Sequence, residues 1–279
     1  MAELINIFGG KGFIGSNYAK LYPDCVVLDR DEYQPKPMAD VLYTISTIDN
    51  YNIFTNPHLD IDTNLSTLIT TLENWKNNYP LGTFVFLSSW FVYGNTDLPA
   101  KEDSYCNPLG FYSITKRTAE QLLISYCTTF NLKYRILRLS NVLGVDDSKV
   151  SKKKNALQYL IGEMKQGNPI ELYDAGFFYR DYMDVEDCCR AINTVITKGA
   201  INEIYNISNG NGKEVLFKDL INYADSKIQS KSVITSIPQK EFHKKIQVHS
   251  MYMDGSKLAA LGYTPKYTIW QTLDKIIDK

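Results

Sequence analysis

The chain has 279 residues, enough for one large domain or two small ones, and its formal net charge of −1 does not indicate a nucleic-acid or anionic membrane partner. No apolar stretch approaches the roughly 20 residues that span a bilayer, and Met1-Ala2-Glu3 leads into an expected strand without the basic region of a signal peptide. The cysteines at positions 25, 106, 127, 188 and 189 lack metal-site spacing, so we expect reduced thiols, no metal and a cytoplasmic protein.

The first expected strand, residues 4–8, is followed by a glycine-rich segment that reads Gly9-Gly10-Lys11-Gly12-Phe13-Ile14-Gly15 and leads into a helix from about Ser16. A strand, a glycine turn and a helix N-terminus together form a cradle for a diphosphate. Gly9 allows the tight turn, Gly12 lets the backbone approach the diphosphate, and Gly15 lets helix and strand pack closely. The segment therefore predicts a dinucleotide site.

A second apolar strand, Cys25–Asp29, ends in an acid. A carboxylate at this place accepts hydrogen bonds from the adenosine ribose and repels a 2′-phosphate, so Asp29 favours NAD over NADP. Arg30 follows directly and could pair with such a phosphate, although a solvated surface charge explains it as well. NAD is the predicted cofactor, and NADP stays open.

The rest of the chain alternates between strands and helices. We expect a strand at 40–46, a helix at 63–77, a strand at 83–87, a helix at 112–130 and a strand at 134–139. This alternation predicts an α/β fold with a doubly wound parallel sheet, whose ligands bind beyond the carboxyl ends of the strands. Residues 1–144 plus about 181–207 would form this domain. Residues 145–180 and 208–279 would form a smaller carboxy-terminal α/β substrate lobe.

Tyr112 and Lys116 lie four apart on an expected helix, so their side chains are neighbours. A phenol with a pKa near ~10 is a poor base at neutral pH, but a nearby ammonium and an oxidised nicotinamide ring would lower that pKa. Such a tyrosine can take the proton of a sugar alcohol while hydride leaves the same carbon. The same spacing recurs at Tyr223 and Lys227, which we interpret as a surface helix pair.

Placement distinguishes the first pair. Ser89 ends a buried strand, where a sheet of this class holds its ligand, and its hydroxyl could bond both the substrate oxygen and the phenol. Ser89 alone would be read as a turn residue, but together with the glycine turn and Tyr112 it is a candidate catalytic residue. The histidines, at positions 58, 243 and 249, form no cluster in sequence and are interpreted as ordinary surface or loop residues.

Taken together, these residues resemble the extended short-chain dehydrogenase/reductase family of NAD-dependent epimerases and dehydratases, which act on nucleotide sugars. The similarity runs from end to end and includes these motifs: Gly9–Gly15 (GxxGFIG), Asn64 (Nxxgt), Ser88–Gly94 (SSxxVYG), Tyr112–Lys116 (YxxxK), Arg138–Gly144 (RxxNVxG), Gly176–Tyr182 (GxxxRDF), and Asp254–Leu258 with Leu261–Pro265. The resemblance implies a Rossmann-type sheet and, commonly, a homodimer formed through the helices that flank the catalytic one.

The resemblance also implies roles for individual residues. The implied catalytic residues are Ser89, Tyr112 and Lys116. The implied cofactor-binding residues are Gly9, Gly12, Phe13, Ile14, Gly15, Asp29, Arg30, Tyr112 and Lys116. Asn141 and Arg180 would hold the substrate diphosphate, although a turn cap and a surface salt bridge are the alternatives. Asn155 resembles a nucleotide-contacting position more weakly, and a helix N-cap explains it equally well.

Two departures from the family narrow the reaction. The acid pair that dehydratases carry after Ser/Thr is replaced by Trp90 and Phe91, and the glutamate of the decarboxylases is missing too. Only about ten residues separate Asp29 from Asp40, where the family usually fits a helix and another strand, so the adenine pocket should be more open. Trp90 and Phe91 could shape the sugar pocket or simply pack in the core.

The resulting hypothesis is an NAD-dependent nucleotide-sugar 4-epimerase of the UDP-hexose type, acting through a transient 4-keto sugar on a nucleotide-diphosphate sugar. The alternative enzyme is an NAD(P)H-dependent 4-keto-sugar reductase of deoxysugar biosynthesis, which the shortened cofactor lobe favours. A dinucleotide-sensing regulator is a third reading, which the presence of Ser89, Tyr112 and Lys116 opposes.

Overall fold

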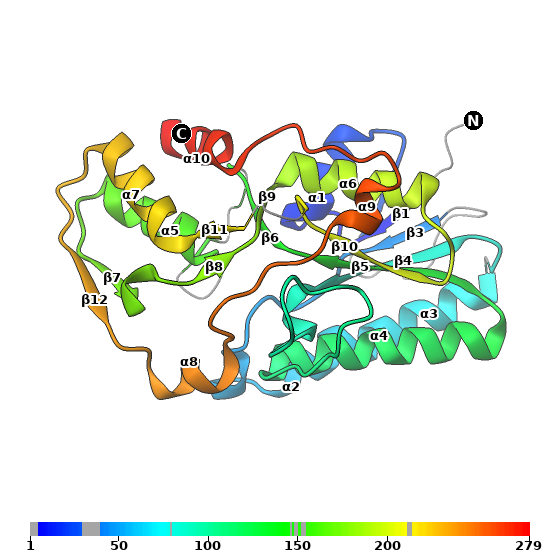
Figure 1. The fold of residues 1–279 in the computed structure, drawn as a ribbon. Helices are drawn as coiled ribbons and strands as arrows, with labels where there is room; N and C mark the ends of the chain where they lie inside the picture. The colour runs from blue at the N-terminus through cyan, green and yellow to red at the C-terminus, as the bar shows by residue number, and fades with distance from the viewer. Residues whose placement is uncertain are drawn as a thin grey trace.

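The computed structural model describes residues 5–29, 40–78, 80–145, 147, 150–151, 155–210 and 214–279. Its centre is a six-stranded sheet whose spatial order is β2-β1-β3-β4-β5-β10 (Figure 1). The strands are β1 (Ile5–Phe8), β2 (Val26–Leu28), β3 (Asp40–Tyr43), β4 (Thr83–Ser89), β5 (Lys133–Leu139) and β10 (Glu203–Ile207). Every pairing in this sheet is parallel, which confirms the predicted sheet.

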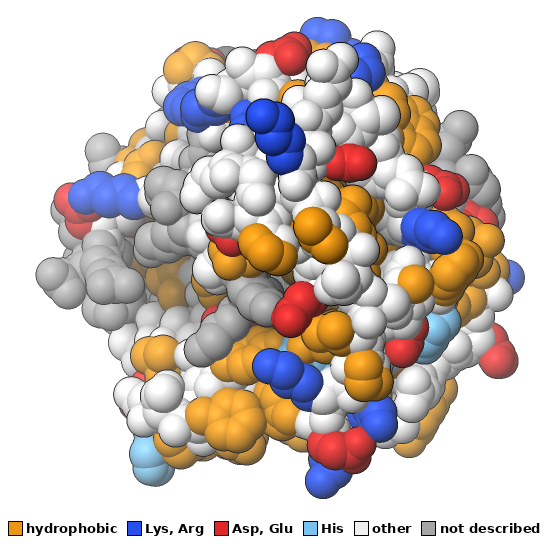
Figure 2. Space-filling view, turned by 90° about the vertical axis from the view of Figure 1, so that its left-hand side faces the viewer, with side chains coloured by type: hydrophobic (Ala, Val, Ile, Leu, Met, Phe, Trp, Pro, Cys, Tyr) orange, Lys and Arg blue, Asp and Glu red, His pale blue; other side chains and the backbone are white. Residues whose placement is uncertain are grey.

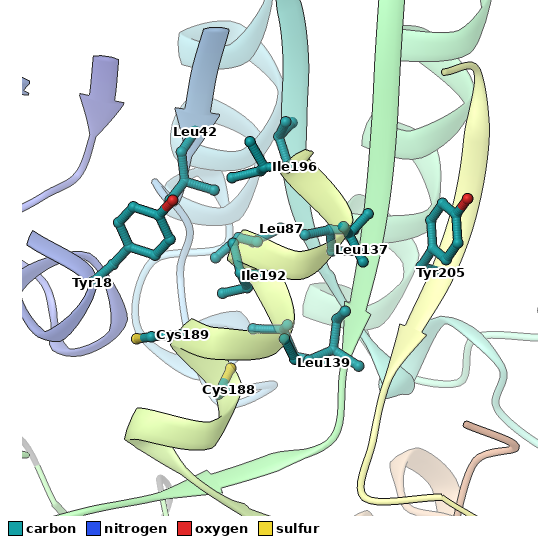
Figure 3. Close-up of a cluster of buried hydrophobic side chains, with 14 of the residues drawn as sticks. Tyr18, Leu42, Leu87, Leu137, Leu139, Cys188, Cys189, Ile192, Ile196 and Tyr205 are labelled. Atoms are coloured by element: carbon teal, nitrogen blue, oxygen red, sulfur yellow. The ribbon is translucent and has the colours of Figure 1, made fainter. Parts of the chain in front are cut away.

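Side chains alternate across each strand and are apolar on both faces of the sheet, so helices cover both faces. Val85 and Leu87 of β4 belong to one apolar cluster with α1 (Phe13–Leu21) and α6 (Val185–Lys198). Figure 3 shows this cluster, with Tyr18 of α1 and Ile192 of α6 pointing toward the sheet. Phe84 and Phe86, with the opposite parity, pack against α3 (Thr67–Asn78) and α4 (Phe111–Phe130).

A separate apolar cluster lies in the part of the chain drawn at the left of Figure 1. Its elements are α5 (Ala156–Lys165), β7 (Ile170–Tyr173), α7 (Phe217–Ile228) and α10 (Ile269–Asp278). Strand β12 (Ile234–Ile237) pairs with β7, β6 (Asn141–Leu143) with β9 (Tyr182–Asp184), and β8 (Tyr179–Arg180) with β11 (Val215–Leu216). Figure 2 shows this end of the molecule, where acidic and basic side chains are scattered among hydrophobic ones.

The remaining helices are short: η1 (Asn52–Phe54), α2 (His58–Ile61), η2 (Asp62–Ser66), η3 (Trp90–Val92), η4 (Asp174–Gly176), α8 (Glu241–Ile246) and α9 (Ser256–Ala259). Two expected boundaries were wrong. Helix α1 already begins at Phe13, and the expected strand 40–46 ends at Tyr43. The strand ends early because its partner β1 ends at Phe8, where the chain turns at Gly9 (φ +81°), and the amide and hydroxyl of Thr44 both donate to the last carbonyl of β1, that of Phe8.

Among the described residues, no helix is both long and apolar enough to cross a membrane. The same part of the chain contains no group of three or more His, Cys, Asp or Glu side chains placed to hold a metal ion. All five cysteines are free, and Cys188 and Cys189 lie on a helix as expected.

Candidate active site

The parallel sheet brings together polar residues that follow different strands. Gly9 comes directly after β1, Ser46 shortly after β3, Ser89 at the end of β4 and Asn141 just after β5. Because these strands are parallel neighbours, their carboxyl ends lie on one edge of the sheet. This edge, formed by the strand ends and distinct from the outermost strands β2 and β10, is where the sequence predicts that ligands bind.

The glycine turn has the geometry of a phosphate cradle. Gly9 has a φ of +81°, which favours glycine, and a Cβ there would lie 2.5 Å from Thr44 Oγ1. A Cβ on Gly15 would lie 2.7 Å from Gly10 Cα and from the Gly9 carbonyl oxygen, both of which are backbone atoms. Gly12 is the N-cap residue of α1, so the backbone stays accessible where the helix begins with Phe13 and Ile14. A diphosphate fits this place because helix N-terminal amides and the helix dipole attract anions.

Asp29 lies at the end of the edge strand β2 and forms an ion pair with Lys11 of the glycine turn. Both side chains are exposed, at 62% for Asp29 and 79% for Lys11. The pair shows that the strand-end carboxylate and the glycine turn are neighbours, as a ribose contact requires. Arg30 lies outside the described residues.

The three candidate catalytic residues meet at the centre of this edge. The side chains of Ser89 and Ser46 lie close enough to the Tyr112 hydroxyl to lower the pKa of the phenol. Lys116 lies one turn further along α4 and donates from Nζ to the carbonyl oxygen of Leu87 at 2.6 Å. The structure therefore places tyrosine, serine and lysine side by side, on the two elements that the sequence assigned to them.

Within the chain itself, burial raises the pKa of Tyr112 to about 12, and Ser89 and Ser46 oppose that rise only in part. The expected lowering of this pKa, which includes an oxidised nicotinamide ring beside the phenol, stays a prediction. Lys116 contributes less positive charge than expected, because burial lowers its pKa to about 7. The Lys116 ammonium also lies over the Phe86 ring, 4.2 Å from its centroid, and not in open solvent.

A buried ionic network supports the lysine. Glu120, one turn beyond Lys116, accepts hydrogen bonds from Arg138 at 3.0 and 2.9 Å and from Arg117 at 2.7 Å. Hydrogen bonds and charge from these arginines lower the pKa of Glu120 against the effect of burial. The remaining negative charge favours protonated Lys116. This network was missed in the sequence, although the four-residue spacing from Lys116 was a signal for it.

Ser46 is the second residue that the sequence analysis missed, because it was included in an expected strand. Its hydroxyl donates to Asn64 Oδ1 at 3.1 Å, and the Asn64 amide donates to Thr115 Oγ1 of α4 at 3.0 Å. Asn64 lies in η2, a π-helical turn, and is buried. Asn64 thus ties Ser46 to the helix that carries Tyr112. A polar residue just after a strand, as at Ser89, was the available signal.

Asn141 and Arg180 both contact Trp90. Trp90 Nε1 donates to Asn141 Oδ1 at 3.3 Å, and the Arg180 guanidinium lies 5.7 Å from the centroid of the indole ring. Asn141 Nδ2 donates to the carbonyl of Asp181 at 2.9 Å, which ties β6 to the segment before β9.

The Arg180 guanidinium is held by main-chain carbonyls. It donates to the carbonyl oxygens of Tyr179, His249 and Val248 at 2.9, 2.7 and 3.0 Å, and burial lowers its pKa to about 10. A guanidinium poised in this way can exchange carbonyl partners for the oxygens of an anionic substrate.

Asn155 is not brought to this cluster by any described contact. It occupies the N-cap position of α5 with a left-handed backbone (φ 54°), but its side chain donates to Asp147 Oδ2 at 2.6 Å and does not cap the helix. His243, which the sequence suggested as an ordinary surface or loop residue, is half-buried on α8, and its Nε2 is 2.7 Å from the Tyr51 hydroxyl.

The second Tyr/Lys pair lies on α7, as expected for a surface helix pair. The Tyr223 hydroxyl donates to Asp274 at 2.7 Å, and Lys227 is 50% exposed. The two pairs have the same spacing, so only their surroundings distinguish them.

Comparisons with known proteins find related chains and a similar fold. A protein of Methanocaldococcus jannaschii named "Putative UDP-glucose 4-epimerase" is 27% identical, with 99% of this chain and 97% of that protein covered. The GDP-6-deoxy-D-mannose reductase of Pseudomonas aeruginosa is 25% identical over 80% of this chain and 74% of its own. A solved structure, the UDP-glucose 4-epimerase of Thermus thermophilus in complex with NAD, is 21% identical with a TM-score of 0.80, and 98% of each chain is covered.

A family model also matches residues 47–208, which include Ser89, Tyr112 and Lys116 and make up more than half of the chain. This match, together with the fold, confirms the resemblance noted in the sequence. The chain belongs to the NAD dependent epimerase/dehydratase family.

Proposed function

We propose that the protein is an NAD-dependent nucleotide-sugar 4-epimerase of the UDP-hexose type. The observation that carries the proposal is the placement of Tyr112 beside Ser89, at the edge of the sheet where the glycine turn lies. The stretch Thr44–Ser46 connects the two places, because Thr44 adjoins Gly9 and Ser46 lies beside Tyr112. The similarity to the M. jannaschii protein supports the same reaction.

The glycine turn and Asp29 would hold the dinucleotide. Gly9, Gly12 and Gly15 let its diphosphate reach the start of α1, beside Phe13 and Ile14, while Asp29 would accept hydrogen bonds from the adenosine ribose. Held there, NAD would supply a reversible hydride acceptor for the sugar carbon C4. Lys116 would hold the nicotinamide ribose.

Tyr112 would act as the general base and acid. As its phenolate, Tyr112 would take the C4 hydroxyl proton while hydride leaves C4, so that a C4 carbonyl forms and the Ser89 hydroxyl donates to its oxygen. Asn141 and Arg180 would hold the diphosphate while the 4-keto sugar turns over. Return of hydride to the other face and of the proton from the Tyr112 phenol would restore the phenolate without net oxidation. Trp90 and Phe91 offer no carboxylate for the elimination of water.

A reductase of 4-keto sugars is the second candidate, and one observation favours it. Strand β2 is the edge of the described sheet, and only residues 29–39 lie between it and β3. A more open adenine site suits a cofactor that leaves after each turnover, and the similarity to GDP-6-deoxy-D-mannose reductase points the same way. Lys11 offsets part of the Asp29 charge that would repel the 2′-phosphate of NADPH.

One assay separates the two reactions. The protein is incubated with UDP-glucose or UDP-galactose and a trace of NAD, and the products are followed by NMR. Formation of the C4 epimer without net NADH supports the epimerase. Stoichiometric loss of NADPH absorbance with a nucleotide 4-keto-6-deoxy sugar, and no epimerisation, replaces it with the reductase. Turnover of neither substrate contradicts both.

Further assignments belong to the same proposal. We propose the domain division given by the sequence, residues 1–144 plus about 181–207 for the cofactor and 145–180 plus 208–279 for the substrate. We also propose a homodimer, supported by three exposed apolar residues on α4, Ile114, Leu122 and Phe130, and tested by light scattering on a gel-filtration column. The free cysteines support a cytoplasmic location.

A further inference from the structure

Two aromatic rings link the candidate base to the candidate diphosphate residues. The Phe91 ring meets the Tyr112 ring edge-on, with centroids 5.8 Å apart and an interplanar angle of 81°. The Trp90 ring stacks on Phe91 at 3.8 Å, nearly parallel at 21°. Trp90 in turn contacts Asn141 and Arg180. The four side chains Tyr112, Phe91, Trp90 and Arg180 therefore form one continuous row.

The two rings differ in exposure. Trp90 is 5% exposed and packs with Val248, Met251 and Met253, whereas Phe91 is half-buried at the margin of that cluster. The indole N–H of Trp90 is donated to Asn141, and Phe91 has no polar atom. Trp90 is thus the fixed support, and Phe91 presents an apolar surface beside Tyr112.

A pyranose that is bound at both ends would lie against the Phe91 ring. If Arg180 holds the diphosphate and Tyr112 the C4 oxygen, the sugar ring lies along Phe91, between the two. The ring atoms next to C4 are C3, which carries a hydroxyl, and C5, which carries C6. Of these two substituents, only the one on C5 can be apolar, and an apolar surface gives no hydrogen bond to replace the water lost from a polar C6.

We propose that Phe91, held in place by Trp90, selects the substrate: it favours nucleoside diphosphate 6-deoxyhexoses, with a methyl group at C5, over the corresponding hexoses and uronates. This inference rests on the proposed function and names the substrate class for it. Trp90 acts as a positioning residue, because it reaches the sugar only through Phe91 and Asn141.

Three substrates that differ only at C6 test the inference: UDP-6-deoxyglucose, UDP-glucose and UDP-glucuronic acid. For the native protein with NAD, we expect kcat/KM and binding affinity, measured by calorimetry, to favour the 6-deoxy sugar by about tenfold to a hundredfold over UDP-glucose. The uronate should be disfavoured further, because its charge would be desolvated.

Two variants separate a selective from a merely structural role. Phe91→Ser should reduce the 6-deoxy preference to less than threefold, whereas Phe177→Ser, at an exposed phenylalanine, should leave it unchanged. Trp90→Phe keeps an aromatic ring but removes the N–H donated to Asn141, so KM should rise for all three sugars while the preference at C6 stays. Loss of stability alone would change all three substrates equally.

The outcomes are distinguishable. Turnover with a C6 preference that is the same in the native protein and in Phe91→Ser overturns this inference and leaves the proposed function intact. Binding that favours the 6-deoxy sugar and loses that preference in Phe91→Ser, without turnover of any sugar, supports the inference and contradicts the proposed reaction. Absence of both binding and turnover overturns both.

Discussion

The Tyr112 hydroxyl lies beside the side chain of Ser89, although one residue is on helix α4 and the other at the end of strand β4. This contact exists because α4 packs on the face of the sheet that Phe84 and Phe86 form. The strand end and the first turn of the helix are thereby fixed against each other. A phenol and a hydroxyl held in this way can share one substrate oxygen.

Removal of the Tyr112 hydroxyl should reduce turnover strongly. We expect Tyr112→Phe to lower kcat about 10²- to 10⁴-fold, the usual contribution of a general acid–base group, while the melting temperature stays within a few degrees. The measurement is C4 epimerisation followed by NMR. Tyr223→Phe, in the pair of identical spacing on α7, is the matched control and should retain full activity. Equal activity of the two variants would contradict the assignment of Tyr112.

Ser46 should contribute to the reactivity of Tyr112. Ser46 lowers the pKa of the phenol, so Ser46→Ala should raise that pKa further and reduce the phenolate fraction at any pH below it. We expect kcat to fall about five- to tenfold at pH 9, the size of effect that one polar interaction contributes. Ser66→Ala, at an exposed serine of η2, should have no effect. An unchanged pH–rate profile in Ser46→Ala would exclude this role.

Buried Lys116 should make stability depend on pH. Its pKa is about 7 in the folded protein and ~10.4 when unfolded, so between these values the unfolded chain binds the extra proton. The free energy of unfolding should therefore rise from pH 7 toward pH 10, relative to Lys116→Met, which does not titrate. Tyr112 does not disturb the comparison, because both proteins retain it. Urea denaturation at pH 7 and 9.5 checks this, and a constant difference between the proteins would contradict it.

Removal of the Glu120 charge should lower the free energy of unfolding strongly. Glu120→Gln would leave the buried Arg138 without its ionic partner, and loss of one member of a buried pair costs about 3–5 kcal/mol. Chemical denaturation at pH 7 measures the loss. Glu241→Gln, in an exposed pair with Lys244, is the control and should produce no measurable change. If Glu120→Gln lowered the free energy of unfolding no more than Glu241→Gln does, the Glu120–Arg138 pair would not stabilise the protein.

Two glycines should respond to alanine in opposite ways. At Gly15 the new Cβ would lie 2.7 Å from backbone atoms of Gly9 and Gly10, which cannot move aside easily, so Gly15→Ala should lower both the melting temperature and the affinity for NAD. A Cβ added at Gly162 of α5 would meet no neighbouring atom within 4 Å, so alanine should stabilise the helix by about 0.5–1 kcal/mol. Calorimetry measures both quantities, and undiminished NAD binding in Gly15→Ala would argue against the cradle.

The parts of the site that the sequence predicted are those with a local signature. The turn at Gly9 depends on neighbours in the chain, so a short pattern was enough, whereas the spacing of Tyr112 and Lys116 was informative only together with Ser89. The contacts of Ser46 and Glu120 are with residues on other elements, so spacing and position after a strand gave only weak signals for them.

The sequence by itself determined the parallel sheet, the glycine turn and the family, because hydrophobic alternation and glycine spacing are set by backbone sterics and by which face is buried. Only the tertiary structure decided which polar groups meet. It placed Ser46 and Ser89 on Tyr112, and stacked Phe91 on Trp90 beside Arg180. It also set how far burial raises the Tyr112 pKa, since the cost of burying a phenolate depends on the surrounding packed chain and not on the residues adjacent in sequence.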